Sequence, residues 1–158
     1  MSKTLYDLID KMTDSQKIEF SLDCAERVPY IFEERYSNDY RPREAIASAR
    51  RYIKHKNEPQ VSLDFLHIYP TSQSVGYALQ CIVWAVAAAY DHFVVLRGMP
   101  ERIAFEAQAA KREAGYEIAS GTLDTMRNKP AAALEAMEKE RDWQRQRAIA
   151  ILGGASDE

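Results

Sequence analysis

The chain has 158 residues, the size of one ordinary domain, and its balance of 46% hydrophobic and 28% charged residues excludes an intrinsically disordered protein. The formal net charge of -3 excludes a positive field over the whole molecule that would draw it onto nucleic acid. The two cysteines, Cys24 and Cys81, form no CxxC pair, so we expect reduced thiols and neither a zinc site nor a disulfide framework.

Helix-forming residues are abundant along the whole chain, and no alternation of apolar and polar residues indicates a strand. We therefore predict an all-α fold, a single-domain helical bundle of about five to six helices around a central apolar helix. The domain should cover residues 1–152, with 153–158 as a flexible tail. The segment MSKTLYDLIDKM lacks the apolar run and cleavage site of a signal peptide, so we expect a cytoplasmic protein.

The first predicted helix covers about residues 4–11, and Thr13 or Asp14 caps the second. The second helix has an apolar face whose residues recur at steps of three and four: Ile18, Leu22, Ala25, Val28, Phe32 and Tyr36. Pro29 lies inside this pattern and predicts a kink in a continuous helix. Pro42 fits the first turn of a third helix that extends to about residue 55.

Two prolines make residues 56–73 a long connection, with one turn at about 63–67. The fourth predicted helix, about 74–96, is apolar nearly all round, which favours the centre of a bundle over a membrane span. A fifth helix is predicted from 100 to about 120. Pro130 is expected to precede the last helix, from 131 to 152.

The sequence offers no catalytic motif. It contains no glycine-rich phosphate loop and no GxSxG elbow, and His55, His67 and His92 lack the spacing of metal ligands. We therefore predict a protein that is not an enzyme, with no catalytic residues, no metal site and no cofactor. The opposite hypothesis, a helical enzyme with a pocket beside the 56–73 connection, would need a deep polar cavity containing His67 or His92.

Basic residues are concentrated in one segment, because residues 41–56 contain six Lys or Arg against one Glu in a chain that is acidic overall. The preceding helix has a polar stripe at helical spacing, formed by Glu19, Asp23, Glu26, Tyr30 and Glu33. If the two helices form an antiparallel hairpin with their apolar faces in contact, the acids of this stripe lie opposite arginines. We therefore predict a structural pairing motif that contains Glu26, Glu33, Asp39, Arg43 and Arg50.

Three residues of the same region, Tyr40, Arg41 and Arg51, are predicted to face outward and to bind a partner. Arginine and tyrosine are residue types that anchor protein interfaces, and guanidinium groups bind carboxylates and phosphates. An alternative interpretation is therefore a helical protein that binds nucleic acid or a phosphate ligand through residues 41–56.

The chain resembles a family of small helical immunity proteins of bacterial polymorphic-toxin systems over roughly residues 19–53. The resemblance rests on these runs: Asp23-Cys24-Ala25-Glu26-Arg27-Val28, Phe32-Glu33, Asp39-Tyr40-Arg41-Pro42-Arg43-Glu44-Ala45-Ile46 and Ala49-Arg50. Tyr40, Pro29 and the 56–73 connection depart from the family pattern.

This resemblance implies a protein that neutralises a toxin or effector by direct binding. A phage-encoded inhibitor of a bacterial defence system is a variant in the same class. The expected partner is a protein, and we expect neither nucleic acid nor a membrane. The acidic surface would suit a basic partner such as a nuclease, because complementary potentials speed encounter. The alanine-rich helical faces leave room for a homodimer.

Overall fold

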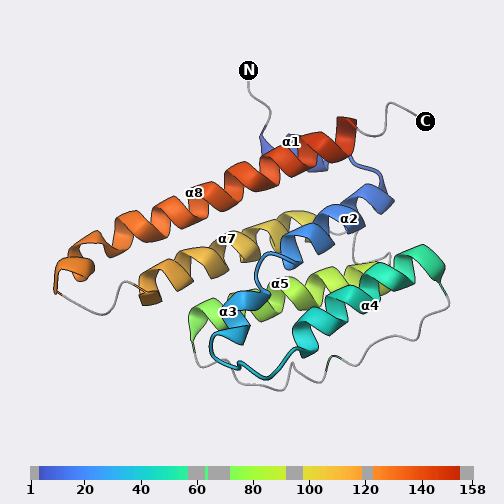
Figure 1. Cartoon of the computed structure of the whole chain (residues 1–158). Helices are drawn as coiled ribbons and strands as arrows, with labels where there is room; N and C mark the ends of the chain where they lie inside the picture. The colour runs from blue at the N-terminus through green and yellow to red at the C-terminus, as the bar shows by residue number, and fades with distance from the viewer. Residues whose placement is uncertain (1–3, 57–62, 64–71, 92–97, 119–122, 154–158) are drawn as a thin grey trace.

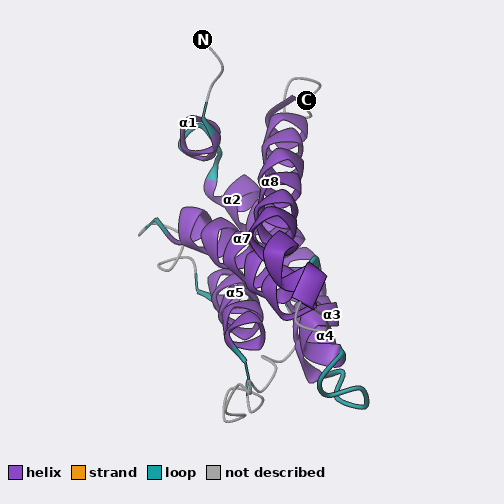
Figure 2. Ribbon diagram, turned by 90° about the vertical axis from the view of Figure 1, so that its left-hand side faces the viewer, coloured by secondary structure: helices purple, strands orange, loops and turns teal. Residues whose placement is uncertain are grey.

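The computed structural model describes residues 4–56, 63, 72–91, 98–118 and 123–153. All regular structure in these residues is helical, which confirms the predicted all-α bundle (Figures 1 and 2). The helices are α1 (Leu5–Ile9), α2 (Asp14–Ala25), α3 (Pro29–Glu33), α4 (Arg41–His55), α5 (Gln73–Tyr90), α7 (Met99–Ile118) and α8 (Leu123–Gly153).

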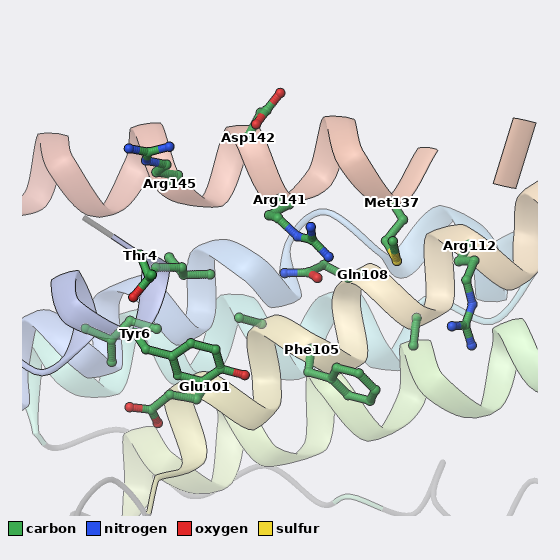
Figure 3. Close-up of a pocket in the computed structure, with 14 residues that line it drawn as sticks. Thr4, Tyr6, Glu101, Phe105, Gln108, Arg112, Met137, Arg141, Asp142 and Arg145 are labelled. Carbon is green, nitrogen blue, oxygen red and sulfur yellow. The ribbon is translucent and has the colours of Figure 1, made fainter. Parts of the chain in front are cut away.

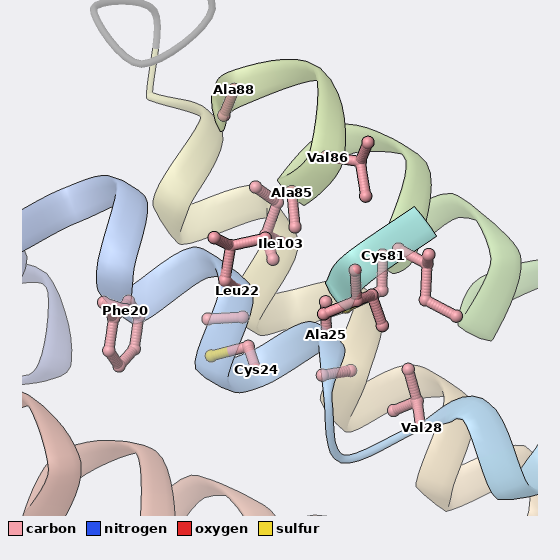
Figure 4. Close-up of a cluster of buried hydrophobic side chains, with 14 of the residues drawn as sticks. Phe20, Leu22, Cys24, Ala25, Val28, Cys81, Ala85, Val86, Ala88 and Ile103 are labelled. Carbon is pink, nitrogen blue, oxygen red and sulfur yellow. The ribbon is translucent and has the colours of Figure 1, made fainter. Parts of the chain in front are cut away.

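The apolar helix α5 lies inside the bundle, as predicted, and packs against α2, α3, α4 and α7. In Figure 1, α5, α7 and α8 follow one another from bottom to top, and α1 lies beside the C-terminal end of α8. The core between α2, α5 and α7 includes both cysteines, which are buried and unpaired (Figure 4). Burial raises the pKa of both thiols well above the ordinary value.

Local sequence signals explain where several helices begin. The Thr13 hydroxyl accepts a hydrogen bond from the Gln16 backbone N–H at 3.3 Å, and the Gln16 side chain accepts one from the Thr13 N–H at 2.9 Å. Thr4 and Asp7 form the same reciprocal cap on α1, and Ser72 caps α5. These contacts satisfy backbone donors that have no partner within the helix.

The predicted kink at Pro29 is wrong, because the structure has a helix break there. α2 ends at Ala25, and Pro29 opens the separate helix α3, where its missing N–H costs no hydrogen bond. The break redirects the chain so that Ile31 and Phe32 are buried in the same core as the residues of α2.

The predicted start of the last helix at residue 131 is also wrong. α8 begins at Leu123 and contains Pro130 within it, although an interior proline costs a helix about 3 kcal/mol or more. α8 packs closely on α7 over this part of its length. A Cβ atom placed on Gly115 of α7 would lie only 3.0 Å from the Cα of Ala133, so the two backbones approach closely beside the proline.

The antiparallel hairpin considered above, in which the apolar faces of α2 and α4 contact each other, is not present. α4 packs mainly on α5, whereas α2 packs on both α5 and α7. Leu22, Ala25, Ile46 and Ala49 belong to one core together with the buried residues of α5. α5 ends at Tyr90, earlier than predicted. His67, His92 and nearly all of the 56–73 connection lie outside the described residues.

Candidate functional site

Arg50 and its partners join three helices. Its Nε donates to Oε1 of Glu26 at 2.8 Å, and its Nη2 donates to Oδ1 of Asp23. The other oxygen of Asp23 accepts from Nε of Arg147 at 2.6 Å, and Nη2 of Arg147 donates to Glu19 at 2.8 Å. Three acids of the polar stripe, Glu19, Asp23 and Glu26, therefore bind one arginine from α4 and one from α8.

Two further arginines of the basic segment have a carboxylate close by. Arg43 forms a two-pronged contact with Glu33, with both donor–acceptor distances at 2.8 Å, and these hydrogen bonds lower the pKa of Glu33. The backbone N–H and the guanidinium of Arg41 donate to Asp39, and the side-chain hydrogen bonds are the largest cause of the lowered pKa of Asp39. The chain itself thus neutralises much of the charge that makes residues 41–56 basic.

The residues predicted to bind a partner occupy different settings. The side chain of Tyr40 is 54% exposed and Arg51 is exposed, whereas the guanidinium of Arg41 is engaged by Asp39. Whether Tyr40, Arg41 and Arg51 bind a partner stays a prediction.

A second region, which the sequence did not reveal, is a groove of about 440 Å³ between α1, α7 and α8 (Figure 3). We call it the α1–α7–α8 groove. Its lining residues are Thr4, Leu5, Tyr6, Ile9, Glu101, Ala104, Phe105, Gln108, Ala109, Arg112, Met137, Arg141, Asp142 and Arg145.

The walls of the groove are mainly apolar, and two aromatic residues stand at its edge. Tyr6 is 61% exposed and Phe105 is 53% exposed, although the groove also contains the fully buried Ile9 and the nearly buried Ala104. Large aromatic side chains that remain in water beside a buried apolar wall indicate a surface that binds another molecule.

Arginines line the α8 side of the groove. Arg141 and Arg145 are four residues apart on α8, and neither forms an ion pair within the part of the chain that the structure describes. Arg112 of α7 differs because its guanidinium contacts Glu113 at 2.8 Å. Asp142 points away from the groove in Figure 3.

A buried polar network lies behind the groove. Nε2 of Gln108 donates to Oε1 of Gln144 at 2.6 Å, and Nε2 of Gln144 donates to the Ala104 carbonyl at 2.9 Å and to Glu140 at 3.3 Å. Glu140 is fully buried and forms ion pairs with Lys111 at 2.6 Å and with Arg27 at 2.9 Å. Because its charge is compensated, Glu140 can remain in the interior and hold α8 against α7.

One carboxylate of the groove is incompletely satisfied. Oε2 of Glu101, on the α7 side below Tyr6 in the view of Figure 3, is buried and has no hydrogen-bond partner among the described residues. A buried carboxylate oxygen without a donor costs free energy, and because protein atoms cover this oxygen, it offers no contact to a ligand in the groove.

The described residues contain no cluster of His, Cys, Asp and Glu that could hold a metal ion, and no helix among them is long and apolar enough to span a membrane. No protein-family model, curated protein or solved structure matches the chain. The candidate site therefore rests on the geometry of the groove alone.

Proposed function

We propose that this protein is a non-enzymatic inhibitor that binds a toxin or effector protein directly, as immunity proteins do, and that it binds through the α1–α7–α8 groove. The observation that carries the proposal is the position of Tyr6 and Phe105, exposed aromatic side chains beside an apolar groove. Such side chains supply much of the binding free energy of protein interfaces when a partner removes them from water.

The internal ion pairs count against the alternative function, nucleic-acid binding through residues 41–56. Arg41, Arg43 and Arg50 each contact a carboxylate. Phosphate contacts depend on cations that release counterions when they bind, and paired arginines contribute less to this effect. We expect no binding of duplex DNA at low salt in a gel-shift assay.

The experiment compares a groove variant with a matched control. Wild-type protein, a Tyr6→Ala/Phe105→Ala variant and a Tyr30→Ala/Tyr40→Ala control are used as baits in the native cell, and the captured proteins are identified. All four residues are exposed, so each variant removes two surface aromatics. Circular dichroism checks that each bait is folded.

We expect wild type and control to retain a protein that slows growth when it is expressed alone. Co-expression of wild type should relieve the growth defect, and co-expression of the groove variant should not. If the control variant loses the partner and the groove variant keeps it, the interface lies at the surface around Tyr40. A captured protein without toxic activity contradicts the inhibitory function.

A further inference from the structure

Most arginines that the structure describes lie close to a carboxylate, and Arg141 and Arg145 differ from them. Seven others have a carboxylate within ion-pair distance: Arg27, Arg41, Arg43, Arg50, Arg102, Arg112 and Arg147. Arg141 and Arg145 have no such partner among the described residues, and both line the α1–α7–α8 groove. Like charges four residues apart on a helix also repel one another by a few tenths of a kcal/mol, which an anion bound between them would relieve.

We infer that the groove receives an amphipathic segment of the protein partner that places a carboxylate against Arg141 and Arg145 and an adjacent apolar side chain against the groove wall. This inference rests on the proposed function and specifies the chemistry of the partner at the same site. Guanidinium groups bind carboxylates through parallel N–H···O contacts, which gives the segment a defined orientation.

The rest of the groove matches such a segment. Leu5, Ile9 and Ala104 provide an apolar wall for its side chain, and Tyr6 and Phe105 can close over it. The groove thus selects a carboxylate on its α8 side and an apolar side chain along its wall.

A protein segment fits this groove better than a polynucleotide does. A nucleic-acid backbone presents a regular series of phosphates and requires a series of cations along its path. Here two uncompensated arginines lie next to apolar walls and the carboxylate of Glu101. The net charge of the whole chain is negative and suggests a basic partner, whereas the arginines of the groove suggest an acidic segment. The charge of the segment in the groove can therefore differ from the net charge of the partner.

Three fluorescein-labelled peptides test the charge preference. They share one helical face of Leu and Phe, and their remaining positions are all Glu, all Gln or all Lys. Fluorescence anisotropy measures their binding to wild type, to an Arg141→Glu/Arg145→Glu variant, and to an Arg51→Glu/Lys54→Glu control that reverses two exposed charges on α4. Circular dichroism and urea denaturation verify that all three proteins are folded.

Wild type and control should bind the Glu peptide about tenfold more tightly than the Gln peptide, as expected for a charge-assisted contact. The Arg141→Glu/Arg145→Glu variant should lose this preference and bind the Lys peptide instead. Equal binding of the Glu and Gln peptides to wild type overturns the inference. So does loss of the preference in the α4 control, or a duplex DNA that displaces the Glu peptide from wild type.

The capture and peptide experiments separate the two proposals. If Tyr6→Ala/Phe105→Ala loses the toxic partner while wild type shows no preference for the Glu peptide, the inhibitory function stands and the proposed chemistry of the segment is wrong. If the charge preference reverses as expected but no captured protein is toxic, the groove chemistry stands and the inhibitory function is wrong.

Discussion

Asp23 joins three helices through one carboxylate. It lies on α2 and accepts hydrogen bonds from Arg50 of α4 and Arg147 of α8, and its side chain is only 11% exposed. Exposed ion pairs contribute little to stability, whereas removal of one member of a partly buried network leaves the other charges uncompensated. Asp23 is therefore the acid of the α2 stripe whose loss should matter most.

We predict that Asp23→Asn lowers the free energy of unfolding by about 1–3 kcal/mol, because two guanidinium groups lose a charged acceptor. Urea denaturation monitored by circular dichroism measures the change. Glu135→Gln is the control, since Glu135 pairs with Lys139 on an exposed face of α8 and its loss should have no measurable effect. Equal effects of the two substitutions would contradict the role of Asp23.

Glu106 should make stability depend on pH. Burial raises the pKa of its carboxyl, although Arg102 at 3.6 Å partly opposes this, and its Oε2 has no hydrogen-bond partner among the described residues. The folded protein therefore binds this proton more tightly than the unfolded chain does. The protonated group favours folding below the unfolded pKa of about 4.5, and this contribution is lost as pH rises through the folded pKa.

Glu106→Gln, which keeps the shape and removes the charge, should consequently be more stable than wild type at pH 7. The difference should shrink as the pH falls toward 4, where wild type takes up the proton itself. Urea midpoints of both proteins across this pH range provide the measurement. A lower midpoint for the variant at pH 7 would show that the charged form is the one that the fold stabilises.

At the scale of elements, the sequence predicted helix content and several helix starts, but it did not predict the effects of Pro29 and Pro130. Thr13 and Pro42 act through neighbours a few residues away, so their patterns were informative. Pro29 and Pro130 both interrupt helical patterns, yet the first opens a new helix and the second lies inside one. The backbone of α7 approaches α8 closely at Ala133, three residues after Pro130, and no local sequence pattern predicts such a contact.

The crossing of α7 and α8 depends on Gly115. A Cβ there would meet the Cα of Ala133 at 3.0 Å and its backbone nitrogen at 3.3 Å. We predict that Gly115→Val lowers the free energy of unfolding by about 1–3 kcal/mol, because the helices must separate, despite the better helix propensity of valine. Chemical denaturation measures this loss.

Gly153→Ala is the matched control, because no described atom beyond its chain neighbours and the adjacent backbone of α8 lies within 4 Å of a Cβ at that position. It should leave stability unchanged or raise it by up to about 1 kcal/mol. A stabilising effect of Gly115→Val would show that the two backbones can separate without cost.

At the scale of the whole molecule, one core includes residues of every helix that the structure describes. A domain of this size with a continuous core should unfold in one cooperative transition. Trp84 of α5 and Trp143 of α8 report on different parts of the bundle, so fluorescence of Trp84→Phe and Trp143→Phe variants can be compared with circular dichroism. Within each variant, we expect fluorescence and circular dichroism to give the same urea midpoint. In the Trp84→Phe variant, which retains Trp143, a fluorescence midpoint at lower urea would indicate that α8 unfolds separately.

The groove could not be predicted from the sequence, because its parts are far apart along the chain. Tyr6 is on α1, Phe105 on α7 and Arg141 on α8, and the bundle alone brings them together. Arg141 and Arg145 lie in a segment that contains both acidic and basic residues, so the sequence does not indicate that they lack an acidic partner. The pairs Arg43–Glu33 and Arg50–Glu26 were easier to anticipate because they join neighbouring segments with complementary stripes.

The network of Gln108, Gln144 and Glu140 also fixes the rotational setting of α8. Successive residues of an α-helix are turned by about 100°, so moving α8 by one residue would carry Arg141 and Arg145 out of the groove and bring other side chains in. Such a shift would also remove Gln144 from the Ala104 carbonyl and separate Glu140 from Lys111. The buried hydrogen bonds and ion pairs of α8 thereby determine that the groove on the surface is lined by positively charged side chains.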